Sequence, residues 1–147
     1  MELTDKVMAV GKMQRFIDRH IEEEITLEDL SASCGYSKYY ALRIFKELTG
    51  RTPFEVIRAI RLTHAAESLR DSKRKVVDIA LDNGFDSHDG FTKAFSRRFG
   101  ITPQKYSKDT PGINYFIHYP IEAYYILKDG KKVCPKKKYR KLLRLQW

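Results

Sequence analysis

The sequence predicts an all-α fold in which two small helical subdomains are joined by one long helix. Two observations lead to this prediction. Apolar residues recur at the spacing of helix faces over most of the 147 residues. A set of turn and cap residues also occurs twice, each member fifty residues after its first copy. The repeated positions are Ser37, Phe45, Gly50, Thr52 and Pro53, which return as Ser87, Phe95, Gly100, Thr102 and Pro103.

The chain is expected to begin with a helix over residues 5–25, followed by a short one over 27–34. Thr26 can cap the short helix, with Asp29 as its capping-box partner, and Gly35 can end it in the left-handed conformation. The apolar face of the first helix is formed by Met13, Phe16, Ile17 and Ile21.

The next two helices begin and end at the repeated residues. Residues 38–49 follow the cap Ser37 and stop at Gly50. The long helix over 53–72 starts with a threonine cap and a proline at its first position, which is a strong start signal. Its core candidates are Ile57, Ile60, Ala65, Ala66 and Leu69.

The second half repeats this order with a short helix over 76–83, closed by Gly84, and a helix over 88–99. Thr102 and Pro103 start one more short helix. A short helix, a glycine turn and a longer helix outline a helix-turn-helix, here made twice. The predicted boundaries are 1–51 for the first subdomain, 52–72 for the linker helix, 73–109 for the second subdomain and 110–147 for a C-terminal extension.

Composition argues against several classes of protein. No apolar run approaches the ~18 residues of a membrane span, and the N-terminus lacks the form of a signal peptide. The two cysteines and four histidines match no metal or redox spacing. No nucleophile arrangement or phosphate loop stands out. We therefore expect a cytoplasmic protein that is not an enzyme and has no cofactor, metal site or membrane partner.

The outward side of residues 38–49 carries a pattern that suits a DNA major groove. Arg43 can bond guanine O6 and N7, while Tyr39 and Leu42 can touch thymine methyl groups. Lys38 and Lys46 suit phosphates. The alternative is an ordinary exposed face with scattered apolar residues.

The second copy has a less distinctive outward side. Its residues are His88, Asp89, Thr92, Lys93, Ser96 and Arg97, while Phe91, Phe95 and Phe99 recur every four residues and predict a core face. Asp89 can accept from cytosine N4 or repel phosphates, and Gly90 costs the helix ~1 kcal/mol relative to alanine. We expect a weaker or less specific reader, with a solvated face as the alternative.

The sequence resembles the AraC/XylS family of bacterial transcription regulators over residues 8–108. The resemblance rests on LSASCGYSKYYALRIFKELTGRTPFEVIRAIRLTHAA and on VVDIALDNGFDSHDGFTKAFSRRFGITPQKY. The family signature falls on Ile79, Ala80, Gly84, Phe85, Phe91, Phe95, Gly100, Pro103 and Tyr106. Two positions depart from the family pattern. Ser107 stands where the family often has arginine, so one possible contact with the DNA backbone is lost. Gly90 replaces a usual helix former.

The resemblance implies that the helices at 38–49 and 88–98 enter successive major-groove segments of double-stranded DNA. Thr52 and Thr102, which precede the two prolines, join the expected DNA contacts. A linker helix of about 19 residues spans ~28 Å, against ~34 Å for one turn of DNA, so bent DNA or tilted helices are expected. The implied function is a sequence-specific transcription regulator, an activator that also contacts RNA polymerase and binds as a monomer.

The C-terminal extension holds most of the positive charge. Residues 128–147 contain nine Lys or Arg and one acid, which is +8 of the net +9. Asp129-Gly130 between strand-like runs signals a β-hairpin. The basic end, PKKKYRKLLRLQW, suits a DNA arm or a partner segment; a loosely ordered tail, or the remnant of a C-terminal ligand-binding domain, are the alternatives. A general nucleic-acid-binding protein and a small-molecule sensor or enzyme stay open as rival functions.

Overall fold

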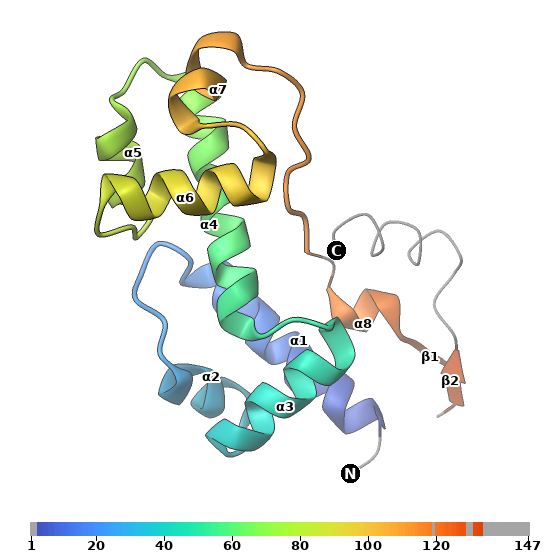
Figure 1. Ribbon diagram of the computed structural model, residues 1–147. Coiled ribbons are helices and arrows are strands. Elements are labelled where there is room, and N and C mark those ends of the chain that lie inside the picture. Colours follow the sequence, from blue (N-terminus) through green and yellow to red (C-terminus); the bar gives the residue numbers. More distant parts are fainter. Residues whose placement is uncertain (1–2, 119, 129–130, 134–147) are drawn as a thin grey trace. The chain divides into compact units, whose positions relative to one another are not determined.

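The computed structural model describes residues 3–118, 120–128 and 131–133 (Figure 1). Most of the described residues are helical, which confirms the all-α prediction. Its elements are α1 (Leu3–Arg19), α2 (Leu27–Cys34), α3 (Lys38–Thr49), α4 (Pro53–Asp71), α5 (Val76–Asp82), α6 (His88–Phe99), α7 (Pro103–Asp109), α8 (Ile121–Tyr124), β1 (Ile126–Lys128) and β2 (Lys131–Val133).

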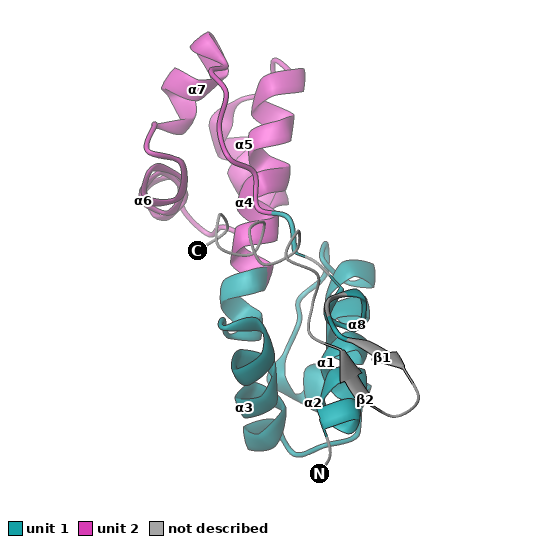
Figure 2. Ribbon diagram, turned by 90° about the vertical axis from the view of Figure 1, so that its right-hand side faces the viewer, with its two compact units in different colours: residues 1–56, 117–147 teal, residues 57–116 magenta. Residues whose placement is uncertain are grey.

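Two compact units divide the chain. Of the described residues, those up to Val56 and from Ile117 onward form the first unit, and Ile57–Phe116 form the second (Figure 2). Each unit contains one copy of the repeat, with α2 and α3 in the first and α5 and α6 in the second. Among the described residues, no helix combines the length and the apolar character needed to cross a membrane.

One helix is shorter than the sequence suggests. The prediction of a helix over 5–25 is wrong at its C-terminal end, because α1 stops at Arg19. Three consecutive glutamates, residues 22–24, follow that end, where the negative pole of the helix dipole disfavours carboxylates. The His20 ring stacks on Phe16 instead, with ring centroids 4.2 Å apart.

The predicted caps are present in both copies of the repeat. The Ser37 hydroxyl accepts from the Tyr40 amide and the Ser87 hydroxyl from the Gly90 amide. The glycines that end α2, α3 and α6 adopt φ values of 79°, 80° and 74°. These are left-handed conformations in which a side chain would be strained, so a serine cap and a left-handed glycine bound both α3 and α6.

The core of the first unit lies among α1, α2 and α3. Met13, Ile17, Leu30, Ile44 and Phe45 are each 0% exposed. Of the face predicted for the first helix, Met13 and Ile17 are confirmed as core, while Phe16 and Ile21 are only half-buried. The opposite side of α3 is thereby turned toward solvent.

The core of the second unit is built on the phenylalanine face of α6. Phe91 and Phe95 are 0% exposed, and Phe99 packs partly buried against the same cluster. The Phe95 ring lies 5.6 Å from Phe91, 4.7 Å from Phe99 and 5.8 Å from Tyr106, between ring centroids. The predicted core face of residues 88–99 is confirmed.

The start of the C-terminal extension packs on the second unit. The Phe116 amide donates to the Thr63 hydroxyl at 2.9 Å, and both residues are buried. The Tyr115 hydroxyl lies 3.0 Å from that of Tyr106. Burial and this hydrogen bond raise the pKa of Tyr106 to about 12, so its hydroxyl stays protonated and able to donate.

The extension then packs on α1 of the first unit. Ile121 is 4% exposed and its amide donates to Gln14 Oε1 at 2.7 Å. Arg15 Nη1 lies 2.7 Å from Glu122 Oε2. A Cβ on Gly11 would lie 2.2 Å from Glu122 Oε1, so a glycine inside α1 makes room for this side chain. These contacts hold Ile121 and Glu122 against α1.

The expected hairpin is also present. Strands β1 and β2 pair antiparallel, with Ile126 opposite Val133 and Lys128 opposite Lys131. The remaining part of the extension, residues 134–147 with the predicted basic arm, lies outside the described residues.

Candidate nucleic-acid interface

The outward side of α3 is the most distinctive surface of the first unit. Tyr39 is 77% exposed, although a tyrosine ring is usually at least partly buried. Arg43 and Lys46 are exposed at the following turns, and Leu42 is half-buried beside them. The structure therefore brings four of the predicted contacts onto one side of a helix whose other side is core.

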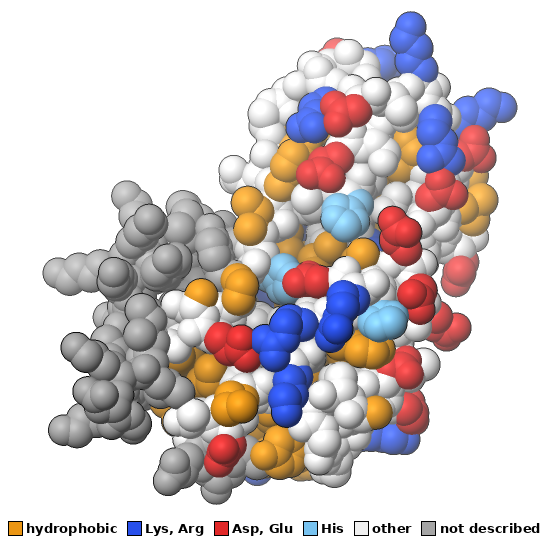
Figure 3. All heavy atoms as spheres, turned by 180° about the vertical axis from the view of Figure 1, so that it is seen from behind, with side chains coloured by type: hydrophobic (Ala, Val, Ile, Leu, Met, Phe, Trp, Pro, Cys, Tyr) orange, Lys and Arg blue, Asp and Glu red, His pale blue; other side chains and the backbone are white. Residues whose placement is uncertain are grey.

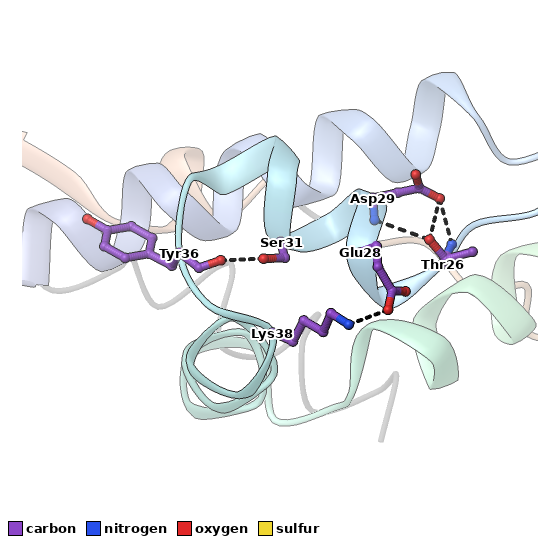
Figure 4. Close-up of polar contacts among 6 residues, drawn as sticks. All are labelled: Thr26, Glu28, Asp29, Ser31, Tyr36 and Lys38. Atoms are coloured by element: carbon purple, nitrogen blue, oxygen red, sulfur yellow. Dashed lines mark hydrogen bonds and ion pairs between the residues drawn. The ribbon is translucent and has the colours of Figure 1, made fainter.

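Lys38, at the start of the same helix, already has an anionic partner. Its Nζ donates to Glu28 Oε1 from α2, so the two helices of the motif are joined by an ion pair (Figure 4). The hydrogen bond from Lys38 holds the pKa of Glu28 below its usual value. A DNA phosphate would have to compete with this carboxylate for Lys38.

Short polar contacts fix the start of α2 and the turn that leads into α3 (Figure 4). Thr26 and Asp29 form the predicted capping box, with the Thr26 amide 2.8 Å from Asp29 Oδ2. Ser31 Oγ donates to the Tyr36 carbonyl at 2.5 Å. Because α2 and the turn are held in this way, the first turn of α3 has a defined position within the unit.

The two predicted threonine contacts are engaged as helix caps. Thr52 Oγ1 accepts from the Glu55 amide at 3.2 Å, and Thr102 Oγ1 accepts from the Lys105 amide at 3.3 Å. Each hydroxyl keeps its own proton for donation. Contact with a phosphate is compatible with capping at either site, and it stays a prediction.

The predicted contacts on α6 separate into two stripes of different exposure. Asp89, Lys93 and Arg97 are exposed, and the Asp89 side chain is 92% accessible. His88, Thr92 and Ser96 are half-buried. The Thr92 and Ser96 hydroxyl oxygens are out of contact with solvent and have no hydrogen-bond partner within the described residues. The accessible stripe therefore has mixed charge and no aromatic residue.

Gly90 has a local reason in the first turn of α6. Its amide donates to the capping Ser87 hydroxyl at 3.0 Å, and an added Cβ would lie 2.9 Å from that oxygen. A side chain would crowd the cap. Gly90 has a low helix propensity, but its lack of a side chain leaves the Ser87 cap unobstructed.

Sequence patterns missed two residues that bear on this surface. Glu28 was overlooked because its partner lies on the next helix, and helical spacing does not show such a pair. Gln104, on α7, lies with its Nε2 only 2.8 Å from His88 Nε2 on α6. No periodicity in the sequence indicates that contact.

Charges of both signs share one face of the molecule. Figure 3 shows lysine and arginine side chains interspersed with aspartate and glutamate on one face. This agrees with the near-neutral balance of residues 1–127, +1 from the total of +9 less the +8 of residues 128–147. Within the described ranges, no cluster of His, Cys, Asp and Glu is placed to hold a metal ion.

Comparison with known sequences gives consistent matches. A family model described as "Helix-turn-helix domain" matches residues 30–109. The transcriptional regulator Rob of Salmonella typhimurium is 36% identical over 117 residues, which are 80% of this chain and 40% of that protein. The regulatory protein SoxS of Escherichia coli K12 is 38% identical over 91 residues, which are 62% of this chain and 85% of SoxS. The chain thus spans about two fifths of the Rob length and most of the SoxS length.

Solved structures match over the same region. An AraC-type DNA-binding regulator from Chromobacterium violaceum aligns with a TM-score of 0.65 at 26% identity, covering 71% of this chain and 96% of that one. The DNA-binding domain of AdpA, determined in complex with a target DNA, aligns with a TM-score of 0.61 at 26% identity, covering 67% and 89%.

Proposed function

The chain belongs to the AraC/XylS family of helix-turn-helix transcription regulators, and from this premise we propose that it binds specific sites in double-stranded DNA and activates transcription. The observation that carries the proposal is the outward side of α3, with Tyr39 77% exposed beside Arg43 and Lys46. A buried opposite face and a capped first turn support such a helix. The DNA complex of AdpA, a structural neighbour, adds support for DNA as the ligand.

Each side chain of α3 has a chemical role in this proposal. Arg43 donates two hydrogen bonds to guanine O6 and N7. Tyr39 and Leu42 contact thymine methyl groups, and Lys46 binds a phosphate. Lys38 binds a second phosphate when it leaves Glu28. Arg43 therefore supplies most of the base discrimination in the first unit.

The second unit is proposed to enter the next major-groove segment through α6. Lys93 and Arg97 are the exposed cations there, and Asp89 disfavours close phosphates and accepts from a base amino group. Because a carboxylate shares this stripe with its two cations, we assign it a smaller share of the affinity than α3. His88, Thr92 and Ser96 lie at the margin of this stripe. Thr52 and Thr102, which cap α4 and α7, donate their hydroxyl protons to phosphates of the DNA backbone.

Three further statements complete the proposal. With two recognition helices in one chain, the protein binds its site as a monomer. It contacts RNA polymerase when it activates transcription. It acts in the cytoplasm, where a bacterial chromosome is accessible.

A second candidate function follows from the coverage of the relatives. The chain corresponds to only 40% of the length of Rob. It could thus represent the DNA-binding part of a regulator that has a C-terminal ligand-binding domain. In that case DNA binding by α3 and α6 is unchanged, and a small ligand adds control. A general nucleic-acid-binding protein is the other alternative, and it differs by lacking sequence preference.

Selection of bound duplexes from a random pool tests the proposal. The selected site should bind at least about a thousandfold more tightly than a scrambled duplex at the same salt concentration, as is typical of specific regulators. A structured RNA of similar length serves as the control. Equal affinity for the selected, scrambled and RNA ligands would favour the general nucleic-acid-binding alternative.

A further inference from the structure

A hydrogen bond joins a side chain of α7 to the first residue of α6. Gln104 Nε2 lies 2.8 Å from His88 Nε2. His88 is the first residue of α6, and its side chain is 41% exposed. Residues at the N-terminal end of a recognition helix are those that reach base edges in helix-turn-helix complexes. The contact therefore concerns a side chain at the reading end of the helix.

The Gln104 amide is oriented with its nitrogen toward the His88 ring. An amide nitrogen only donates, so in this orientation the imidazole Nε2 accepts. A neutral imidazole has one protonated nitrogen and one acceptor nitrogen. The proton of His88 is therefore on Nδ1, which becomes a hydrogen-bond donor.

A neighbouring carboxylate favours the same arrangement. His88 Nδ1 lies 3.9 Å from Asp89 Oδ1, too far for a hydrogen bond and close enough for electrostatic attraction to an N–H group. The Asp89 side chain is 92% exposed. The start of α6 thus presents a donor, His88 Nδ1–H, beside an acceptor, the Asp89 carboxylate.

We propose that Gln104 is a positioning residue of the DNA interface, which holds His88 as the Nδ1–H tautomer so that His88 and Asp89 together select adenine. In the major groove, adenine offers the acceptor N7 beside the donor N6–H2, whereas guanine offers two acceptors and cytosine only a donor. Thymine offers one acceptor beside a methyl group. This inference rests on the proposed function, because it needs α6 in a major groove.

The tautomer can be measured without DNA. Two-dimensional proton–nitrogen spectra of the free full chain at pH 8 distinguish protonated from unprotonated ring nitrogens. We expect His88 Nδ1 to be protonated in the natural protein and in Gln104→Lys, whose ammonium group can only donate. In Gln104→Glu, whose carboxylate accepts, the proton should move to Nε2. A natural protein with its proton on Nε2 would overturn the inference.

Base selection provides the second readout. Duplexes that differ at one position of the selected site, including one with 7-deazaadenine, are compared for the three proteins. The natural protein and Gln104→Lys should prefer adenine by about tenfold and lose that preference when N7 is removed. Gln104→Glu should lose the preference for adenine and keep the preferences at other positions. Changes in net charge affect all duplexes alike and cancel in these ratios.

The two readouts separate this inference from the proposed function. If the natural protein prefers no duplex, the proposed function fails, while the ring spectrum still decides the tautomer. If the natural protein is selective and Gln104→Glu retains the same preference at every position, only the role of Gln104 is wrong. Because Gln104 is exposed on α7, equal melting temperatures of the three proteins are expected and are checked first.

Discussion

The two units have the same framework and different outward surfaces. Serine caps and left-handed glycines bound α3 and α6 alike, with φ of 80° at Gly50 and 74° at Gly100. The accessible side of α3 carries an aromatic ring and two cations, whereas that of α6 carries Asp89 between its cap and its cations. The cap and turn residues that set the helix ends are repeated in the two units. The solvent-facing residues of α3 and α6 are not repeated. Under the proposed function, this difference gives one fold two readers of unequal strength.

The largest expected effect is on stability, and it should be about equal for core substitutions in the two units. Phe95→Ala and Phe45→Ala each remove a ring that is 0% exposed. Each should lower the free energy of unfolding by about 3–5 kcal/mol, measured by urea denaturation. Hydrogen exchange should place the loss in α5–α7 for Phe95→Ala and in α1–α3 for Phe45→Ala. An unchanged denaturation curve for Phe95→Ala would mean that the apolar face of α6 is not a core.

The next effect tests whether the extension is part of the first unit. Ile121→Ala should cost about 2–3 kcal/mol, because Ile121 is 4% exposed against α1. Ile117→Ala is the matched control, since Ile117 is 58% exposed and its truncation should change stability by less than ~0.5 kcal/mol. Equal small effects of both substitutions would show that the packing of α8 contributes nothing.

The third effect compares the two readers directly. Arg43→Ala should lose about 1–3 kcal/mol of binding to the selected site and relax discrimination at one base pair. Arg97→Ala, at an exposed position of α6, should lose less. Fluorescence anisotropy on the selected and scrambled duplexes measures both. Equal losses on the two duplexes would reduce Arg43 to a phosphate contact.

The basic end of the chain should add affinity for DNA without adding sequence preference. Residues 134–147 hold six Lys or Arg and no acid. Their deletion leaves Phe116 and Ile121 in place and should flatten the slope of log affinity against log salt by ~2, at ~0.9 per phosphate. The selected site should stay the same. Identical slopes for the full and shortened chains would assign this segment to a protein or ligand instead.

The smallest effect concerns the ion pair that occupies Lys38. Glu28→Gln should free Lys38 for a phosphate, raise the affinity for all duplexes equally and steepen the salt slope by up to ~0.9. In the free protein the lowered pKa of Glu28 means that its contribution to stability is present above pH 4.5 and is lost as the pH falls through the lowered value. Acid titration of stability should lose this component in Glu28→Gln. An unchanged salt slope would mean that Lys38 binds no phosphate.

Local chemistry made most of the fold predictable. The caps Thr26, Ser37 and Ser87, and the glycines at the helix ends, are determined by the backbone within a few residues. Alternating core and solvent faces likewise follow from helical spacing. The end of α1 at Arg19 was missed because the apolar pattern continues to Ile21 and Ile25, past the glutamates that disfavour a longer helix.

Contacts between distant segments could not be predicted in the same way. The bond from the Ile121 amide to Gln14 joins residues 107 positions apart, and no spacing rule covers it. Gly11 inside α1 was the one available signal, because a glycine there suggests a close approach by another segment. The contacts of Glu28 with Lys38 and of Gln104 with His88 cross between helices, so they became visible only with the folded chain.

Interference by single 7-deazapurine substitutions along the selected site tests the central claim most directly, because each substitution removes a major-groove N7 acceptor at one base. The proposal of two recognition helices predicts two clusters of interfering purines, about one helical turn or ~10 base pairs apart. Arg43→Ala should erase one cluster and leave the other. A single cluster, or two clusters that both survive Arg43→Ala, would contradict the assignment of α3 and α6 as separate readers of unequal strength.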